Sequence, residues 1–259
     1  MSRRRNKYYD RKLKLQAVQD YLGGGGSLRT ICKKHGIKDK KQLRNRIKWY
    51  NGHTKKEDRV RMKLICIGDS LTFGYGVRSS QRWTRLCAQE TGWEIVNEGI
   101  SGDTTGGMLV RLRALLADRD ICVQRPLVLL MGGANDIFFS GTDTGARANM
   151  GAMLNQLLSL GVHTMIGIPT PICAENAPPA WAAVVDFRSA ERQLEQYCAW
   201  LRRFSKCFGA ECIDFRADFF DPNGRLKREL LLDGLHPTPE GHQIMVRRLC
   251  AHLKRERQG

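Results

Sequence analysis

Short apolar runs alternate with stretches of helical periodicity along most of the chain after residue 62. The apolar runs predict five buried strands, at residues 64–67, 94–97, 127–131, 164–168 and 211–213. Between and after them, apolar positions at helical spacing predict helices at residues 82–90, 105–118, 145–160, 181–208 and 239–255. Since strands and helices alternate, the pattern predicts a parallel, doubly wound α/β sheet with helices on both faces.

The first quarter of the chain shows helical periodicity without strand-like runs. Apolar positions from about residue 10 predict a first helix, which the glycines at 23–26 end. Ser27 is the predicted N-cap of a second helix, Gly36 lies in the turn that follows, and Ile37 leads into a third helix. Helix, glycine turn and helix at this spacing predict a small all-α helix-turn-helix domain.

Charge separates the same two parts. Of the formal net charge of +17, residues 1–63 contribute +16, from 21 Lys and Arg against 5 Asp and Glu, whereas residues 64–259 hold 22 against 21. We therefore divide the chain into a basic helix-turn-helix domain at residues 1–53, a charged linker at 54–62 and a near-neutral α/β domain at 63–259. The asymmetry indicates that the first part binds a polyanion.

Four polar motifs of the α/β domain each supply something that ester hydrolysis needs. In chain order they read Gly68-Asp-Ser-Leu71, Ser101-Gly-Asp-Thr104, Gly133-Ala-Asn-Asp136 and Asp233-Gly-Leu-His236. A serine hydroxyl becomes a good nucleophile when a base takes its proton, and the developing oxyanion needs hydrogen-bond donors. The first three motifs follow predicted strands, so they are expected to meet where the carboxyl ends of parallel strands form one edge of the sheet.

Five residues have expected roles at that edge. Ser70 is the candidate nucleophile, His236 the general base, and Asp233 the residue that orients His236 from three positions away. The side-chain amide of Asn135 and the backbone N–H groups of Gly102 and Ser70 are the expected oxyanion donors. Position 102 is expected to be glycine because the backbone there must approach the substrate closely.

These motifs make the chain from about residue 63 to the C-terminus resemble an SGNH (GDSL-type) hydrolase, whose four family letters match Ser70, Gly102, Asn135 and His236. The resemblance implies a flavodoxin-like three-layer α/β/α fold with a five-stranded parallel sheet. It also implies hydrolysis of esters or thioesters without a metal or an organic cofactor. The stretch Ile100-Ser-Gly-Asp-Thr104 is most similar to the small thioesterase/lysophospholipase-like branch of the family.

The sequence leaves the substrate open. Three connections are expected to shape an acyl pocket, at residues 73–82, 138–147 and 169–183. Phe138 and Phe139 either line that pocket or belong to the core. Acetyl esters of sugars, short acyl esters, lysophospholipids and thioesters are all compatible with the motifs.

Residues 9–53 resemble the N-terminal helix-turn-helix of insertion-sequence transposases, notably in Ser27-Leu-Arg-Thr-Ile-Cys-Lys-Lys-His-Gly36. The resemblance implies binding of duplex DNA with the third helix as recognition element. Its contacts would come from the basic residues in and before that helix, namely Lys38, Lys40, Lys41, Arg44, Arg46 and Lys48. Arg46 departs from the family pattern, which has an aromatic residue there. A solvated face and a protein-docking arm are the other interpretations of this segment.

Two classes of function follow from these observations. The preferred one is a serine esterase or acyl hydrolase with a DNA-binding-like appendage. The other is a DNA-binding protein whose hydrolase-like domain acts as a sensor or scaffold. Nine cysteines without a Cys-x-x-Cys pair, no secretory signal and no run of ~18 apolar residues predict a cytoplasmic protein without a metal site or a membrane span.

Overall fold

The computed structural model describes residues 16–18, 20–21, 26–37, 40–41, 43–45, 47, 62–117 and 126–256. The chain divides into two units, residues 1–61 and 62–259, and each is described by itself. Of the linker expected at residues 54–62, only Met62 lies among the described residues.

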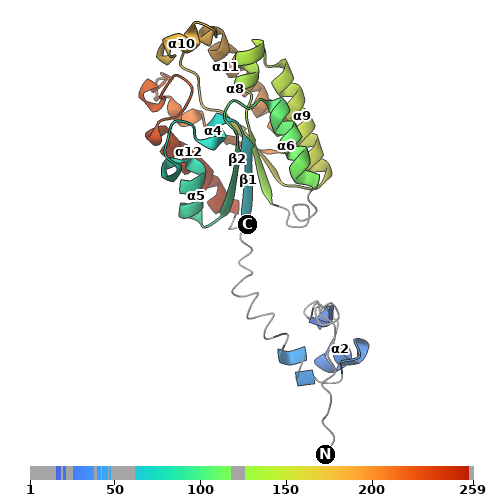
Figure 1. The fold of residues 1–259 in the computed structure, drawn as a ribbon. Helices are drawn as coiled ribbons and strands as arrows, with labels where there is room; N and C mark the ends of the chain where they lie inside the picture. The colour runs from blue at the N-terminus through green and yellow to red at the C-terminus, as the bar shows by residue number, and fades with distance from the viewer. Residues whose placement is uncertain are drawn as a thin grey trace, which may run out of the picture. The chain divides into compact units, whose positions relative to one another are not determined.

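The second unit is built on one sheet of five parallel strands (Figure 1). The strands are β1 Lys63–Gly68, β2 Glu94–Gly99, β3 Leu127–Met131, β4 Thr164–Ile168 and β5 Glu211–Asp214. Their order is β2-β1-β3-β4-β5, which is that of flavodoxin-like doubly wound sheets. The structure therefore confirms the predicted strands and the parallel sheet.

Helices cover both faces of this sheet and make three layers. They are α4 Ser70–Phe73, α5 Trp83–Thr91, α6 Thr105–Ala117, α8 Ala134–Ser140, α9 Thr144–Ser159, α10 Pro179–Ala182, α11 Phe187–Cys207 and α12 Pro239–Glu256. Figure 1 shows α5 and α12 together on one side of the sheet and α6 and α9 on the other. Short 3-10 turns occur at residues 79–81, 174–176, 217–219 and 228–230.

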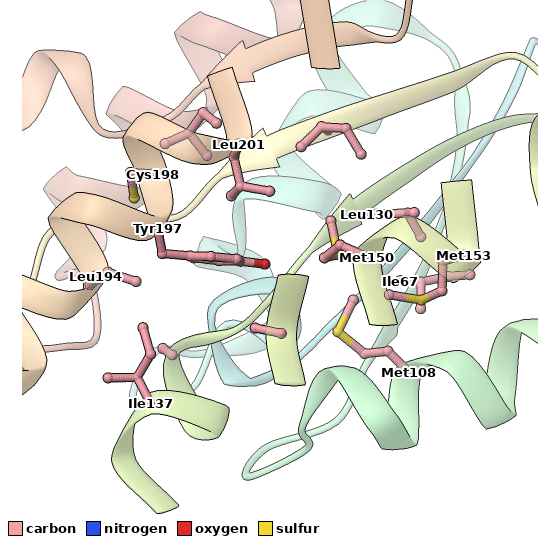
Figure 2. Packing of buried hydrophobic residues seen from close by; sticks show 14 of the residues in the cluster. Ile67, Met108, Leu130, Ile137, Met150, Met153, Leu194, Tyr197, Cys198 and Leu201 are labelled. Atoms are coloured by element: carbon pink, nitrogen blue, oxygen red, sulfur yellow. The ribbon is translucent and has the colours of Figure 1, made fainter. Parts of the chain in front are cut away.

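Successive residues of β1 alternate between two hydrophobic clusters, as the pleat of a strand requires. Leu64 and Cys66 pack with buried residues of α5 and α12. Ile65 and Ile67 pack with buried residues of α6, α9 and α11. Figure 2 shows this second cluster, in which Tyr197 of α11 lies among aliphatic and methionine side chains. Burial on both faces explains why the strands appear as continuous apolar runs in the sequence.

The structure corrects the prediction of one long helix at residues 181–208. The chain forms α10, turns, and starts again as α11, whose N-cap is Asp186. The carboxylate of Asp186 accepts a hydrogen bond from the backbone N–H of Ser189 at 2.9 Å, which satisfies a donor at the start of the new helix. The short helices α4 and α8, which directly follow β1 and β3, were not predicted.

In the first unit, the described residues surround a small apolar cluster. Ser27 caps α2 (Leu28–Lys34) as predicted, since its hydroxyl oxygen accepts from the N–H of Thr30 at 3.3 Å. The described positions at 16–21 and 40–47 are helical. The cluster consists of the buried residues Ala17, Val18, Ile31, Cys32, Ile37, Leu43 and Ile47.

Three of the basic residues expected to contact DNA, Lys40, Lys41 and Arg44, are exposed. The other three, Lys38, Arg46 and Lys48, lie outside the described residues. Much of the predicted third helix lies outside them too, so the helix-turn-helix arrangement stays a prediction.

The first residue of α5 makes two buried hydrogen bonds, one to α12 and one to α4. The backbone N–H of Trp83 donates to Nδ1 of His242 at 3.3 Å, and the Trp83 indole N–H donates to the carbonyl of Leu71 at 2.9 Å. Trp83 and His242 are both fully buried. Burial, together with the charges of Arg82 and His236, lowers the pKa of His242 from 6.5 to about 4.

This pKa predicts that acid destabilises the second unit through His242. In the unfolded chain His242 takes up a proton near pH 6.5, whereas the folded chain resists protonation down to about pH 4, so stability is lost as pH falls through that window. Between pH 7 and pH 4.5 this loss is about 2 kcal/mol. Urea unfolding of the protein and of His242→Gln, which keeps an acceptor but does not titrate, measures the difference. An equal loss of stability in both proteins would contradict the prediction.

Candidate active site

Ser70 lies at the carboxyl end of β1, as the first residue of α4. Asp69 is the N-cap of this helix, and its Oδ1 accepts from the N–H of Leu71 at 2.9 Å. The carbonyl of Ser70 accepts from the N–H groups of Gly74 and Tyr75 at 2.9 and 3.1 Å. The backbone on both sides of the serine is thus held by hydrogen bonds, which fixes the position of its side chain.

His236 makes a hydrogen bond from each ring nitrogen, one to Ser70 and one to Asp233. Its Nε2 lies 2.8 Å from the Ser70 Oγ, and its Nδ1 lies 2.7 Å from the Asp233 Oδ2. A carboxylate only accepts hydrogen bonds, so the Nδ1 proton faces Asp233 and the lone pair on Nε2 faces the serine hydroxyl. The structure therefore brings together the three residues that the sequence suggested as nucleophile, general base and orienting carboxylate.

Asp233 is held by more than the imidazole. Its Oδ1 accepts from the backbone N–H groups of Leu235 and His236 at 3.2 and 2.9 Å. Burial by itself raises the pKa of Asp233, but the hydrogen bonds from the side chain and backbone of His236 outweigh it, so the pKa lies below the ordinary value. The carboxylate is ionised at neutral pH and can stabilise a positive charge on His236.

The second and third motifs are hydrogen-bonded to each other. The side-chain amide of Asn135 donates to the carbonyl of Asp103 at 2.8 Å. The carboxylate of Asp136 accepts from the N–H and the hydroxyl of Thr105 at 2.9 and 2.6 Å, at the first turn of α6. Gly102 has a φ of +80°, a backbone conformation that favours glycine.

A cavity of about 410 Å³ opens over these residues. Its polar end is formed by four of the predicted site residues together with Ser101, and the rest of its lining is aromatic or aliphatic. The polar group comprises Ser70, Ser101, Gly102, Asn135 and His236, and the other lining residues are Tyr75, Phe138, Phe139, Trp181, Val184, Val185, Phe187 and Leu235.

Each of the three connections expected to shape the pocket contributes to its lining, through Tyr75, through Phe138 and Phe139, and through Trp181. Phe138 serves both roles that were considered for it, because it also packs on the main core, with its ring 5.1 Å from that of Phe187. Phe139 is 73% exposed at the cavity. The rings of Tyr75 and Trp181 also lie next to that of His236, with centroid distances of 4.5 and 6.1 Å.

The sequence analysis missed three residues that line the cavity and one buried carboxyl group beside Ser70. The chain turns between α10 and α11, and this turn brings Val184, Val185 and Phe187 to the cavity. The turn was not predicted, because the apolar positions there continue at helical spacing. The carboxyl group is that of Asp69, which is completely buried next to Ser70. Desolvation raises the pKa of Asp69 to about 7. The signal that could have identified it is its position before a helix start at the end of a fully apolar strand.

Among the residues that the structure describes, no group of three or more His, Cys, Asp or Glu side chains is arranged to hold a metal ion. Over the same residues, no helix combines the length and the apolar character that crossing a membrane needs.

The sequence profile of the GDSL-like lipase/acylhydrolase family matches residues 66–244, which is well over half of the chain. The chain belongs to this family. The chain is a carboxylic ester hydrolase. The matched range contains Ser70, Gly102, Asn135, Asp233 and His236.

Two curated relatives are similar to about three quarters of this chain. Esterase TesA of Pseudomonas aeruginosa is 26% identical over 202 residues, which cover 74% of this chain and 87% of the esterase. The arylesterase of Vibrio mimicus is 32% identical over 201 residues, which cover 74% of this chain and 90% of that protein.

Solved structures are similar to the GDSL-like hydrolase in fold. The crystal structure of a member of the lipolytic protein G-D-S-L family from Veillonella parvula superposes with a TM-score of 0.62 at 22% sequence identity. It covers 75% of this chain and 99% of the other chain. This likeness agrees with the three-layer α/β fold and its five-stranded parallel sheet.

Proposed function

We propose that the protein hydrolyses carboxylic esters or thioesters through an acyl-enzyme on Ser70. The observation that carries this proposal is the continuous hydrogen-bonded line from Asp233 through His236 to the Ser70 Oγ. Nucleophile, base and orienting carboxylate are within hydrogen-bonding distance before any substrate binds.

In the first half-reaction, the Ser70 Oγ attacks the carbonyl carbon while its proton passes to Nε2 of His236. Asp233 stabilises the imidazolium that forms. The negative charge on the carbonyl oxygen is stabilised by the N–H groups of Ser70 and Gly102 and by the amide of Asn135. An amide has two N–H donors, and only one of those of Asn135 is used by the carbonyl of Asp103, so the second is available to the substrate.

In the remaining steps, His236 returns its proton to the leaving oxygen or sulfur, and an alcohol or thiol departs. His236 then accepts a proton from water, whose oxygen attacks the acyl carbon. As the second tetrahedral intermediate collapses, His236 gives this proton to the Ser70 Oγ, which releases a carboxylic acid and restores the serine hydroxyl.

The lining of the cavity favours substrates with an apolar acyl or alcohol part. Its polar groups gather at Ser70, while Phe138, Trp181, Phe187 and Leu235 offer aromatic and aliphatic surface. A sugar ring would leave its hydroxyl groups without partners on such a surface, which costs free energy. Among the substrate classes that the sequence left open, we therefore favour apolar acyl esters and thioesters over acetylated sugars. The esterase and arylesterase named above are compatible with this choice.

We further propose that the first unit binds duplex DNA through its basic residues. The charge excess of this part supports the proposal, as does the exposure of Lys40, Lys41 and Arg44 around an apolar cluster. If the first unit binds DNA, it would hold the esterase of the second unit on DNA. A protein that binds DNA and uses its hydrolase-like unit only as a sensor or scaffold is the alternative.

The first test concerns the nucleophile. A fluorophosphonate probe is expected to label the protein and Ser159→Ala, a control at an exposed helix position, but not Ser70→Ala. Turnover of p-nitrophenyl butyrate should follow the labelling. Labelling that persists in Ser70→Ala would remove this serine from the role. If the unchanged protein is folded but neither labelled nor active, the alternative function is favoured, in which the hydrolase-like unit is a sensor or scaffold.

The second test concerns the oxyanion site. Asn135→Ala is expected to lower kcat by about 10² to 10³, the usual loss for one oxyanion donor, with a smaller change in KM. The matched control is Asn155→Ala, which removes an exposed amide on α9. Steady-state kinetics and thermal unfolding are measured on both. Full turnover by a folded Asn135→Ala protein would contradict the assignment.

The third test concerns DNA and uses the full chain. Fluorescence polarisation with a labelled duplex at several salt concentrations gives the log-log slope of the binding constant, which contains about −0.9 for each phosphate neutralised. The double charge reversal of Lys40 and Arg44 to Glu should weaken binding and make the slope shallower. The same reversal at the exposed residues Lys206 and Arg247 should change it far less. Equal binding by the two variants, or none at low salt, would rule out this DNA interface.

A further inference from the structure

The loop that carries Gly102 is held at the site by a side chain that lies outside the four motifs. At Gly102 itself, a Cβ atom would find no atom of a non-adjacent residue within 4 Å, so close packing at this position does not fix the backbone. Yet the N–H of Gly102 can stabilise an oxyanion only if it is held in place before the reaction. Something else must therefore determine the conformation of residues 101–103.

Arg111, on α6, makes four hydrogen bonds at this point. Its Nε and Nη2 donate to the Asp103 Oδ2 at 2.9 and 2.6 Å. Its Nη2 also donates to the carbonyl of Gly68 at 2.8 Å, and its Nη1 donates to the carbonyl of Glu98. One guanidinium thus connects the loop to the carboxyl ends of β1, which leads into Ser70, and of the neighbouring strand β2.

Asp103 is in turn connected to the third motif. Its backbone carbonyl accepts from the Asn135 side-chain amide at 2.8 Å, and its N–H donates to the carbonyl of Ile100 at 3.2 Å. Displacement of Asp103 would therefore move two proposed oxyanion donors together, the N–H of the preceding Gly102 and the amide of Asn135. The contacts of Arg111 and Asn135 converge on the same residue.

The first turn of α6 leaves room for the carboxylate that Arg111 binds. A Cβ atom built on Gly107 would lie 1.8 Å from the Asp103 Oδ1, which is too short for two atoms that are not bonded to each other. At the neighbouring Gly106, a Cβ atom would make ordinary contacts at 3.5 and 3.6 Å with Thr104 and Asn149. The carboxylate of Asp103 thus occupies the space that a side chain at position 107 would need.

From these contacts we infer that Arg111 is a positioning residue for the oxyanion site, acting through Asp103 on Gly102 and Asn135. The inference rests on the oxyanion roles proposed above for these two residues. A guanidinium suits this role because its planar donors reach one carboxylate and two carbonyl groups at the same time, which a single ammonium group does not match. The pair is also shielded, with side-chain exposures of 20% for Arg111 and 15% for Asp103, so competition from solvent is reduced.

The test compares Arg111→Ala with Arg113→Ala, which removes an exposed arginine from the same helix. Arg111→Ala is expected to lower kcat for p-nitrophenyl butyrate by about 10²-fold, as a misplaced catalytic group does, with KM changed by about threefold or less. Arg111→Lys should lie between the two, and added guanidinium ion should restore part of the activity of Arg111→Ala. Arg113→Ala should behave as the unchanged protein does.

A transition-state analogue separates this role from a merely structural one. An alkyl boronic acid forms a tetrahedral adduct with a catalytic serine and places an oxygen in the oxyanion site. Its affinity for Arg111→Ala should fall by the same factor as kcat/KM. Gly107→Ala should show the same parallel loss, because its methyl group displaces the Asp103 carboxylate, whereas Gly106→Ala should retain both activity and affinity.

Near-normal kcat in a folded Arg111→Ala protein would overturn the inference. So would activity and boronic acid affinity that fall by unrelated factors, or unfolding of both Arg111→Ala and Gly107→Ala at the assay temperature, which would make the arginine a stabilising residue only. Ser70→Ala, measured in parallel, keeps the two proposals apart. If Ser70→Ala retains turnover, the proposed mechanism fails, whereas loss of turnover there with full activity in Arg111→Ala refutes the positioning role alone.

Discussion

The hydrogen bond between the Ser70 Oγ and His236 Nε2 joins two residues 166 positions apart, and the proposed chemistry depends on it. Neither partner can reach the other through local structure. Ser70 is placed by the end of β1 and the start of α4, whereas His236 lies in the connection that precedes α12. The packing of α12 on α5, next to β1 and β2, brings that connection to the edge of the sheet where Ser70 lies.

Several carboxyl groups lie close to the place where negative charge would develop, and their surroundings differ. Asp233 faces His236, Asp136 accepts from the first turn of α6, and Asp103 is paired with Arg111. Among the residues that the structure describes, Asp69 has no cationic hydrogen-bond partner, but its burial raises its pKa to about 7. An unpaired carboxylate beside a developing oxyanion would oppose its formation, so these arrangements favour an ester hydrolysis site.

The strands of the second unit could be predicted because a sheet that is buried on both faces requires continuous apolar runs. Most of its helices could be predicted from apolar positions at helical spacing. The short helices α4 and α8 could not, because four to seven residues do not show a helical period. The boundary between α10 and α11 was missed for another reason. Val184 and Val185 continue an apolar pattern, but in the folded chain they line the cavity rather than extend a helix.

The sequence by itself predicted Ser70, Asn135, Asp233 and His236 as the chemistry-bearing residues, because each lies in a short motif whose residue types and order suit ester hydrolysis. It also determined where the charge lies. Only the tertiary structure decided which residues support those motifs. Arg111 lies on an amphipathic helix, where an arginine ordinarily indicates a solvated face, and its contact with Asp103 arises only when α6 packs beside β1 and β2. The pocket lining was decided in the same way, because its side chains come from separate connections that are neighbours only after the sheet has formed.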